Sequence, residues 1–158
     1  MEVRKLKVRD QMPELSGATE WLNGELTKVD LVGEKPTLIH FWSVSCQLCK
    51  SAMPQVNQFR DKYGNRLNVV AVHMPRYKAD LDIEVIKKAA KEQGIIQPIF
   101  IDSQHLLAEA FKNEYLPAYY IFDKEGLLRH FQVGNNKEKM ESLEKRLNHI
   151  VGEIVKAK

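Results

Sequence analysis

Residues 37–50 of the chain read TLIHFWSVSCQLCK, and they carry the strongest indication of the fold. Its first six residues form an almost continuous apolar run, which is typical of a central β-strand covered on both faces. Only His40 interrupts that run. Cys46 and Cys49 follow at once, and the residues after them are typical of a helix. The stretch therefore predicts a buried strand that leads through a short turn into a helix beginning near Cys46.

On both sides of this stretch, short apolar runs alternate with amphipathic segments. Strands are expected at residues 37–42, 67–74, 98–102, 118–122 and 127–133, the last two as an antiparallel hairpin. Helices are expected at residues 46–62, 82–94 and 106–111 and from Met140 onward. Asn23-Gly24, between Trp21-Leu22 and Glu25-Leu26, predicts an additional N-terminal hairpin. The pattern indicates one α/β domain, residues 1–158, with a central mixed β-sheet flanked by helices.

Composition and charge narrow the possible partners. Apolar residues make up 44% of the 158 residues, charged residues 28%, and the net charge is +3 without a basic run. This mixture disfavours nucleic acid and anionic membranes as partners. The N-terminal segment lacks an apolar signal region, and no window reaches the length of a transmembrane helix. We therefore expect a cytoplasmic protein, and we expect a monomer because no exposed apolar stripe predicts an obligate dimer.

The spacing of the two cysteines indicates redox chemistry. A secreted disulfide framework would need more cysteines spread along the chain, whereas a close pair in a reducing cytosol is more often redox-active or metal-binding. At the start of a helix, unpaired N–H groups and the helix dipole favour a thiolate on Cys46, and such thiols have pKa values of roughly 3.5–7.5. Cys49 lies one turn further along the same face, where it can attack a mixed disulfide on Cys46.

Two simpler interpretations of the pair remain open. Cysteine is often buried without a chemical role, so two inert thiols on a helix would fit the same spacing. A structural zinc site needs four ligands, and the chain has no second CxxC pair. We expect no metal and no cofactor at this motif.

The motif and two prolines resemble the thioredoxin-like redoxins. Residues 41–50 resemble their active-site segment, and Pro54 matches the proline within their active-site helix. Leu116-Pro117-Ala118 precedes a strand, where that family places its cis-proline loop. The helix and strand expected between Val69 and Pro117 resemble the insertion of the TlpA/ResA-like redoxins.

The resemblance extends over most of the chain. About residues 8–156 are similar to the YkuV-type thiol–disulfide oxidoreductases, and residues 34–42 and 114–120 look nearly specific to them. The resemblance implies a thioredoxin-like fold in which Cys46 attacks a substrate disulfide and Cys49 resolves the mixed disulfide. It also implies a cis Pro117, although the residues alone favour an ordinary trans proline at a strand start.

The same resemblance implies a substrate-binding surface around the motif. Its candidate residues are Trp42, Gln47, Leu48, Leu116 and Pro117. In this interpretation Pro117 faces the sulfurs and places the Leu116 backbone to pair with an extended substrate segment. The substrates would be disulfide-containing proteins or small molecules, and an electron donor of unknown identity would regenerate the dithiol.

Two positions depart from the family pattern. Thioredoxins carry a buried aspartate before Phe-Trp, where this chain has His40, and TlpA/ResA-like proteins often carry a glutamate where this chain has Ala52. Both usual carboxylate bases are therefore missing. His40 is the candidate base for Cys49, because an unperturbed imidazole titrates near pH 6.5. A neutral core histidine bonded to a backbone carbonyl is the alternative.

Several functions compete on this fold. The first is reduction of disulfides, and the second is disulfide oxidation or isomerisation, which differs in reduction potential and compartment. A copper metallochaperone would have to use Cys46, Cys49 and the distant His73 as ligands. A peroxidase would need a peroxidatic cysteine flanked by threonine and arginine, and the motif lacks that pattern.

Overall fold

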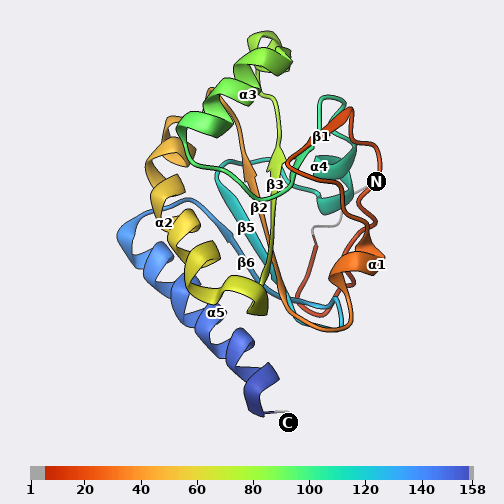
Figure 1. Ribbon diagram of the computed structural model, residues 1–158, viewed down its shortest axis with the longest axis vertical. Coiled ribbons are helices and arrows are strands. Elements are labelled where there is room, and N and C mark those ends of the chain that lie inside the picture. Colours follow the sequence, from red (N-terminus) through yellow and green to blue (C-terminus); the bar gives the residue numbers. More distant parts are fainter. Residues whose placement is uncertain (1–5, 157–158) are drawn as a thin grey trace.

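A six-stranded mixed sheet forms the centre of the structure, a computed structural model that describes residues 6–156 (Figure 1). Its strands are β1 (Glu20–Leu22), β2 (Thr37–Trp42), β3 (Asn68–His73), β4 (Ile99–Ile101), β5 (Ala118–Phe122) and β6 (Leu128–Val133). They lie in the order β1-β4-β3-β2-β5-β6. Strands β2, β3 and β4 are parallel, whereas β1, β5 and β6 each run antiparallel to the neighbour on their inner side. The predicted mixed sheet is confirmed.

Strand β2 is buried along its whole length, as its apolar run predicts. It pairs with β3 on one side and with β5 on the other. Because side chains alternate between faces, Leu38 and Trp42 pack into one core, while Ile39 and Phe41 pack into the other. A strand that must satisfy two apolar layers can hold almost no polar residue, which explains its composition.

Helices cover both faces of the sheet. They are α1 (Lys28–Leu31), α2 (Gln47–Tyr63), α3 (Ile83–Glu92), α4 (Leu106–Phe111) and α5 (Lys137–Lys156), with short 3₁₀ turns at η1 (Gly64–Arg66) and η2 (Lys78–Leu81). Figure 1 shows α2 and α5 side by side on one side of the sheet and α1 and α4 on the other. Within residues 6–156, no helix combines the length and apolarity needed to cross a membrane.

Helix α3 begins where its sequence signals place it. The Asp82 carboxylate accepts hydrogen bonds from the N–H groups of Glu84 at 3.0 Å and Val85 at 3.4 Å, which satisfies donors that the first turn leaves unpaired. Gly94 follows the helix with a φ of 71°, a conformation that suits a residue without a Cβ. Helix α3 and strand β4 lie between β3 and β5, so the expected helix–strand insertion is present.

The predicted N-terminal hairpin is wrong. Asn23 and Gly24 do adopt the positive φ values of a turn, 62° and 125°. The chain beyond them forms helix α1, whose first turn is fixed by a capping box between Thr27 and Asp30. No second strand is therefore available, and β1 pairs with β4 instead. Asn23 supports that pairing, because its amide donates to the carbonyl oxygen of Gln97, just before β4, at 3.1 Å.

Candidate active site

The two cysteines lie where the chain passes from the end of β2 into α2. They form a disulfide with 5.3 Å between their Cα atoms. Cys46 is the N-cap of α2, and its Sγ accepts a hydrogen bond from the N–H group of Cys49 at 3.1 Å. Both residues are almost completely buried, at 4% and 2% exposure. The first turn of the helix therefore points the Cys49 N–H group at the sulfur of Cys46, and the positive end of the helix dipole lies there, which favours negative charge on that atom.

The loop before β5 approaches the same end of the sheet. The peptide bond between Leu116 and Pro117 is cis. Ala118 pairs with Phe41 in the antiparallel ladder, so Pro117 lies beside the end of β2 that leads into the motif. Leu116 is half-buried and packs against both cores, and the carbonyl oxygen of Pro117 accepts a hydrogen bond from the Gly134 N–H group at 2.8 Å.

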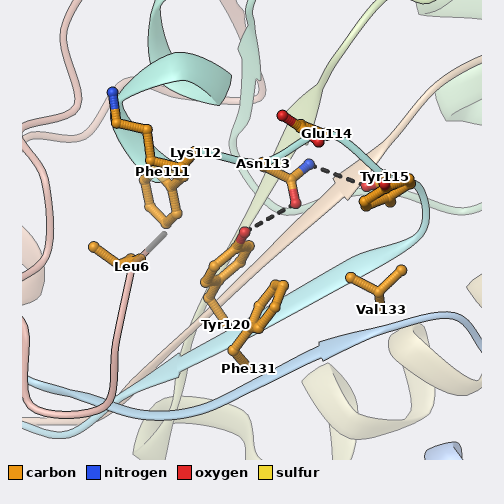
Figure 2. A pocket seen from close by; sticks show the side chains of 9 residues that line it. All are labelled: Leu6, Phe111, Lys112, Asn113, Glu114, Tyr115, Tyr120, Phe131 and Val133. Carbon is orange, nitrogen blue, oxygen red and sulfur yellow. Dashed lines mark hydrogen bonds between the residues drawn. The ribbon is translucent and has the colours of Figure 1, made fainter. Parts of the chain in front are cut away.

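Asn113 holds this loop in place from its other end, as Figure 2 shows. Its Oδ1 accepts a hydrogen bond from the Tyr120 hydroxyl at 2.9 Å, and its Nδ2 donates to the Tyr115 carbonyl oxygen at 3.1 Å. An apolar pocket of about 350 Å³ lies here, with Leu6 and Phe131 in its lining (Figure 2). No residue of the cysteine motif lines that pocket, so it is separate from the disulfide.

The dipeptide between the cysteines faces outward. Gln47 is exposed, and Leu48 has 56% of its surface exposed despite being apolar. The Leu48 carbonyl oxygen accepts a hydrogen bond from Asn135 Nδ2 at 2.9 Å, which ties the motif to the segment between β6 and α5. Gln47 and Leu48 are therefore available for contact with a substrate, whereas Pro117 is buried and Leu116 is accessible only in part.

Trp42 does not belong to the exposed substrate surface, in contrast to the prediction. Its side chain is fully buried at 0% exposure. As the last residue of β2, it faces the core that contains the cysteines, and its ring meets the edge of the His73 ring at a centroid distance of 5.0 Å. The alternation of side chains along the strand turns it inward, so it supports the motif from beneath.

His40 is engaged by other side chains rather than free to act as a base. Its Nε2 lies 2.9 Å from Gln97 Nε2, and Gln97 Oε1 accepts a hydrogen bond from Arg60 Nη1 at 2.8 Å. Arg60 thereby fixes the amide orientation, so Gln97 donates to the ring. Burial, with a smaller contribution from the Arg60 charge, lowers the pKa of His40 to about 3. The base role of His40 toward Cys49 remains a prediction, and it would require this hydrogen bond to break.

His73 lies close to the motif but is also neutral. Burial lowers its pKa to about 4, although the nearby Asp80 charge opposes that shift. The N–H group of Val44, two residues before Cys46, donates to its Nε2 at 3.3 Å. Among the residues that the structure describes, no three histidine, cysteine or acidic side chains gather as metal ligands. The geometry thus gives no support to copper binding by the cysteines and His73.

The two neutral histidines predict that stability depends on pH. The unfolded chain takes up a proton at each histidine near pH 6.5, whereas the folded chain does so only near pH 3 for His40 and pH 4 for His73. Unfolding therefore binds protons below pH 6.5, and stability falls as the pH drops from 6.5 toward 4. The expected slope is up to about 1.4 kcal/mol per pH unit for each histidine.

Urea unfolding at pH 7.5, 6 and 5 measures this slope. His40→Gln removes one of the histidines whose pKa the fold lowers, while His73 and His130 remain, so its slope below pH 6 should be smaller by up to about 1.4 kcal/mol per pH unit. An unchanged slope in that variant would show that His40 titrates normally in the folded chain.

Two residues beside the motif, Arg76 and Asp80, gave no signal in the sequence pattern. Ser43, Ser45, Arg76 and Asp80 form one hydrogen-bonded group that links the start of α2 to the segment after β3. The segment that contains Arg76 and Asp80 has neither a strand nor a helix periodicity, so nothing in it indicated a site. The burial of Asp80 is seen only in the structure, so it offered no signal in the sequence.

The fold and the disulfide-forming pair define a thioredoxin-like thiol–disulfide oxidoreductase. The chain belongs to the AhpC/TSA family, whose sequence pattern matches residues 8–131.

The chain is similar to named thiol–disulfide oxidoreductases and to a solved thioredoxin-like structure. The chain is 64% identical over 148 residues to the thiol-disulfide oxidoreductase YkuV of Bacillus subtilis (strain 168), a match that covers 94% of this chain and 99% of the relative. It is 26% identical over 117 residues to the thiol-disulfide oxidoreductase ResA of Geobacillus kaustophilus (strain HTA426), covering 73% and 63%. The solution structure of a thioredoxin-like protein in the oxidized form matches with a TM-score of 0.86 and 63% identity over 94% of this chain and 99% of that one. The predicted fold and the resemblance to YkuV-type and ResA-like redoxins are confirmed.

Proposed function

We propose that the protein reduces the disulfides of other molecules in the cytoplasm, with Cys46 as the attacking thiol and Cys49 as the resolving thiol. One observation carries this assignment of roles. Cys46 Sγ lies at the N-terminus of α2 and accepts the Cys49 N–H group, so it is the sulfur whose thiolate the helix stabilises. Cys49 lies one helical turn deeper, at disulfide distance from it.

The exchange proceeds in two balanced steps. The Cys46 thiolate attacks one sulfur of the substrate disulfide, the substrate S–S bond breaks, and the second substrate sulfur leaves as a thiolate. Cys49 then loses its proton and attacks Cys46 Sγ, which breaks the mixed disulfide and releases the first substrate sulfur as a thiolate. The substrate gains two electrons in total, and the protein is left with the Cys46–Cys49 disulfide. The two substrate thiolates take up the proton that Cys49 released and the proton that the solvent received when the Cys46 thiolate formed.

Exposed groups around the motif suit a polypeptide or small-molecule disulfide. Gln47 and Leu48 form the outer side of the contact, and Leu116 beside the cis Pro117 forms the other side. Because this surface is mostly apolar, it should bind substrates without strong selectivity among them. A cellular thiol donor of unknown identity would return the disulfide to the dithiol.

The cysteine content supports the reducing direction and the cytoplasmic location. The chain has two cysteines, both in the motif, so its fold depends on no structural disulfide and is suited to a reducing compartment. The oxidase or isomerase alternative uses the same two sulfurs and differs in the direction of electron flow.

A comparison of the two directions tests the proposal. With dithiothreitol as donor, the protein should accelerate the reduction of insulin disulfides. Its oxidised form should not promote disulfide formation in reduced, unfolded ribonuclease. Efficient oxidation of ribonuclease together with no acceleration of insulin reduction would assign the oxidase function instead. Cell fractionation with an antibody tests the location, and recovery outside the cytoplasmic fraction would contradict it.

A further inference from the structure

A single buried carboxylate joins the segment before Cys46 to the segment after β3. Asp80 is 3% exposed, and its Oδ2 accepts hydrogen bonds from the hydroxyls of Ser43 at 3.1 Å and Ser45 at 2.7 Å. The same oxygen accepts the N–H groups of Arg76 at 2.8 Å and Tyr77 at 3.1 Å. Four donors thus converge on one oxygen, two from each segment.

Arg76 adds a second connection between these segments. Its Nη2 donates to the Ser45 carbonyl oxygen at 2.6 Å, and its Nε donates to the Ser45 hydroxyl at 3.3 Å. The guanidinium lies over the Tyr77 ring, 5.5 Å from the ring centroid. Ser45, the residue directly before Cys46, is therefore held at its side chain by Asp80 and at its carbonyl oxygen by Arg76.

The segment so held determines where Cys46 lies. The Cys46 N–H group donates to the Ser43 carbonyl oxygen at 3.1 Å, and the Val44 N–H group donates to the His73 ring. Each of residues 43–45, which lead into helix α2, is thus held by at least one hydrogen bond to the segment after β3 or to His73. A shift of this segment would move Cys46 Sγ relative to the N–H groups that favour its thiolate.

The carboxylate also places a negative charge near the motif. Burial raises the pKa of the Asp80 carboxyl, but the hydrogen bonds from Arg76, Ser45, Tyr77 and Ser43 together outweigh burial and leave the pKa below its ordinary value. Asp80 is therefore ionised at neutral pH. Its charge is close enough to act on His73, whose ring contacts Val44.

We propose that Asp80 is a positioning residue of the dithiol site, which holds residues 43–45 in place and restrains the acidity of the Cys46 thiol. This proposal deepens the proposed function, since it rests on Cys46 being the attacking thiol. A fixed negative charge disfavours a second one nearby, so Asp80 should raise the pKa of Cys46 and disfavour the reduced form, which carries the Cys46 thiolate. The hydrogen bonds of the same carboxylate should keep the sulfur in its attacking position.

Two substitutions separate the charge from the hydrogen bonds. Asp80→Asn keeps the shape and one acceptor oxygen but removes the charge, so the pKa of Cys46 should fall by roughly half a unit to one unit. The equilibrium with glutathione should move about threefold toward the reduced protein, which corresponds to about 14 mV. Asp80→Ala removes all acceptors as well, so the attack rate of the Cys46 thiolate should fall by about tenfold.

The control is Asp123→Asn, which follows strand β5 at the end away from Pro117 and the cysteines. Asp123 is also buried and accepts two backbone N–H groups, from Glu125 and Leu127, each at 3.0 Å. Asp123→Asn should therefore lower the free energy of unfolding without changing the pKa or the reactivity of Cys46.

The pH dependence of iodoacetamide alkylation gives the pKa and the intrinsic reactivity of Cys46 in each folded variant, and glutathione buffers give the equilibrium. A lower pKa in Asp80→Asn, with slower thiolate attack only in Asp80→Ala, supports the proposal. A wild-type pKa in Asp80→Asn would overturn it, whatever Asp80→Ala does. Absence of the low-pKa thiol from the unsubstituted protein would instead refute the assigned role of Cys46, so the two failures are distinguishable.

Discussion

Replacement of Cys46 by serine should abolish disulfide reduction, with turnover lower by roughly a thousandfold or more. A serine hydroxyl is not ionised at neutral pH, and the N-terminus of helix α2 cannot lower its pKa enough to make it a nucleophile. The buried position changes little in volume, so the variant should fold. Insulin reduction with dithiothreitol measures the loss.

Cys49→Ser and Ser51→Ala provide the comparison. Cys49→Ser retains the attacking thiol, so it should form a stable mixed disulfide with the substrate that gel electrophoresis without reductant detects. Ser51 is exposed on the same helix and donates only to the Gln47 carbonyl oxygen, so Ser51→Ala should retain nearly full activity. If Cys46→Ser formed the trapped species and Cys49→Ser did not, the two roles would be reversed.

Phe111→Ala should lower the free energy of unfolding by about 3–5 kcal/mol. Phe111 ends helix α4, is 1% exposed, and makes edge contacts with Phe41, Tyr120 and Phe122 at centroid distances of 5.2, 4.9 and 6.0 Å. Its removal leaves a cavity beneath the loop that leads to Pro117. Urea denaturation measures the change, and the midpoint of thermal unfolding should fall by roughly 10 °C.

Leu106→Ala on the same helix is the matched control. Leu106 is 46% exposed, so the loss should be no more than about 1 kcal/mol. Equal losses in the two variants would show that the aromatic cluster does not contribute more than helix propensity and ordinary surface contact.

The elements with a strong local signal were predictable from the sequence. An apolar run long enough for a strand buried on both faces identified β2, and the cysteine spacing at its end identified the start of α2. Asp82 identified the first turn of α3, because a carboxylate at that position satisfies N–H groups that have no partner in the helix. These signals depend on residues close together in the chain.

The features that the sequence did not reveal depend on residues far apart in the chain. The turn at Asn23-Gly24 is real, but its strand pairs with β4, about eighty residues further on, and a local turn signal carries no information about that partner. His40 acquires its low pKa from burial and from the charge of Arg60, which is twenty residues away in the chain. Asp80 contacts Ser43 and Ser45 across a separation of more than thirty residues, so no spacing motif marks it.

The reduction potential of the Cys46–Cys49 pair decides whether the protein acts as a reductant. The protein is equilibrated in dithiothreitol or glutathione buffers of known potential, and the fraction of free thiol is determined after acid quenching. We expect a value at or below roughly −230 mV, in the range of thioredoxins and glutaredoxins that act as reductants. A value above roughly −180 mV would identify an oxidant or isomerase and would contradict both the proposed direction of transfer and the cytoplasmic location.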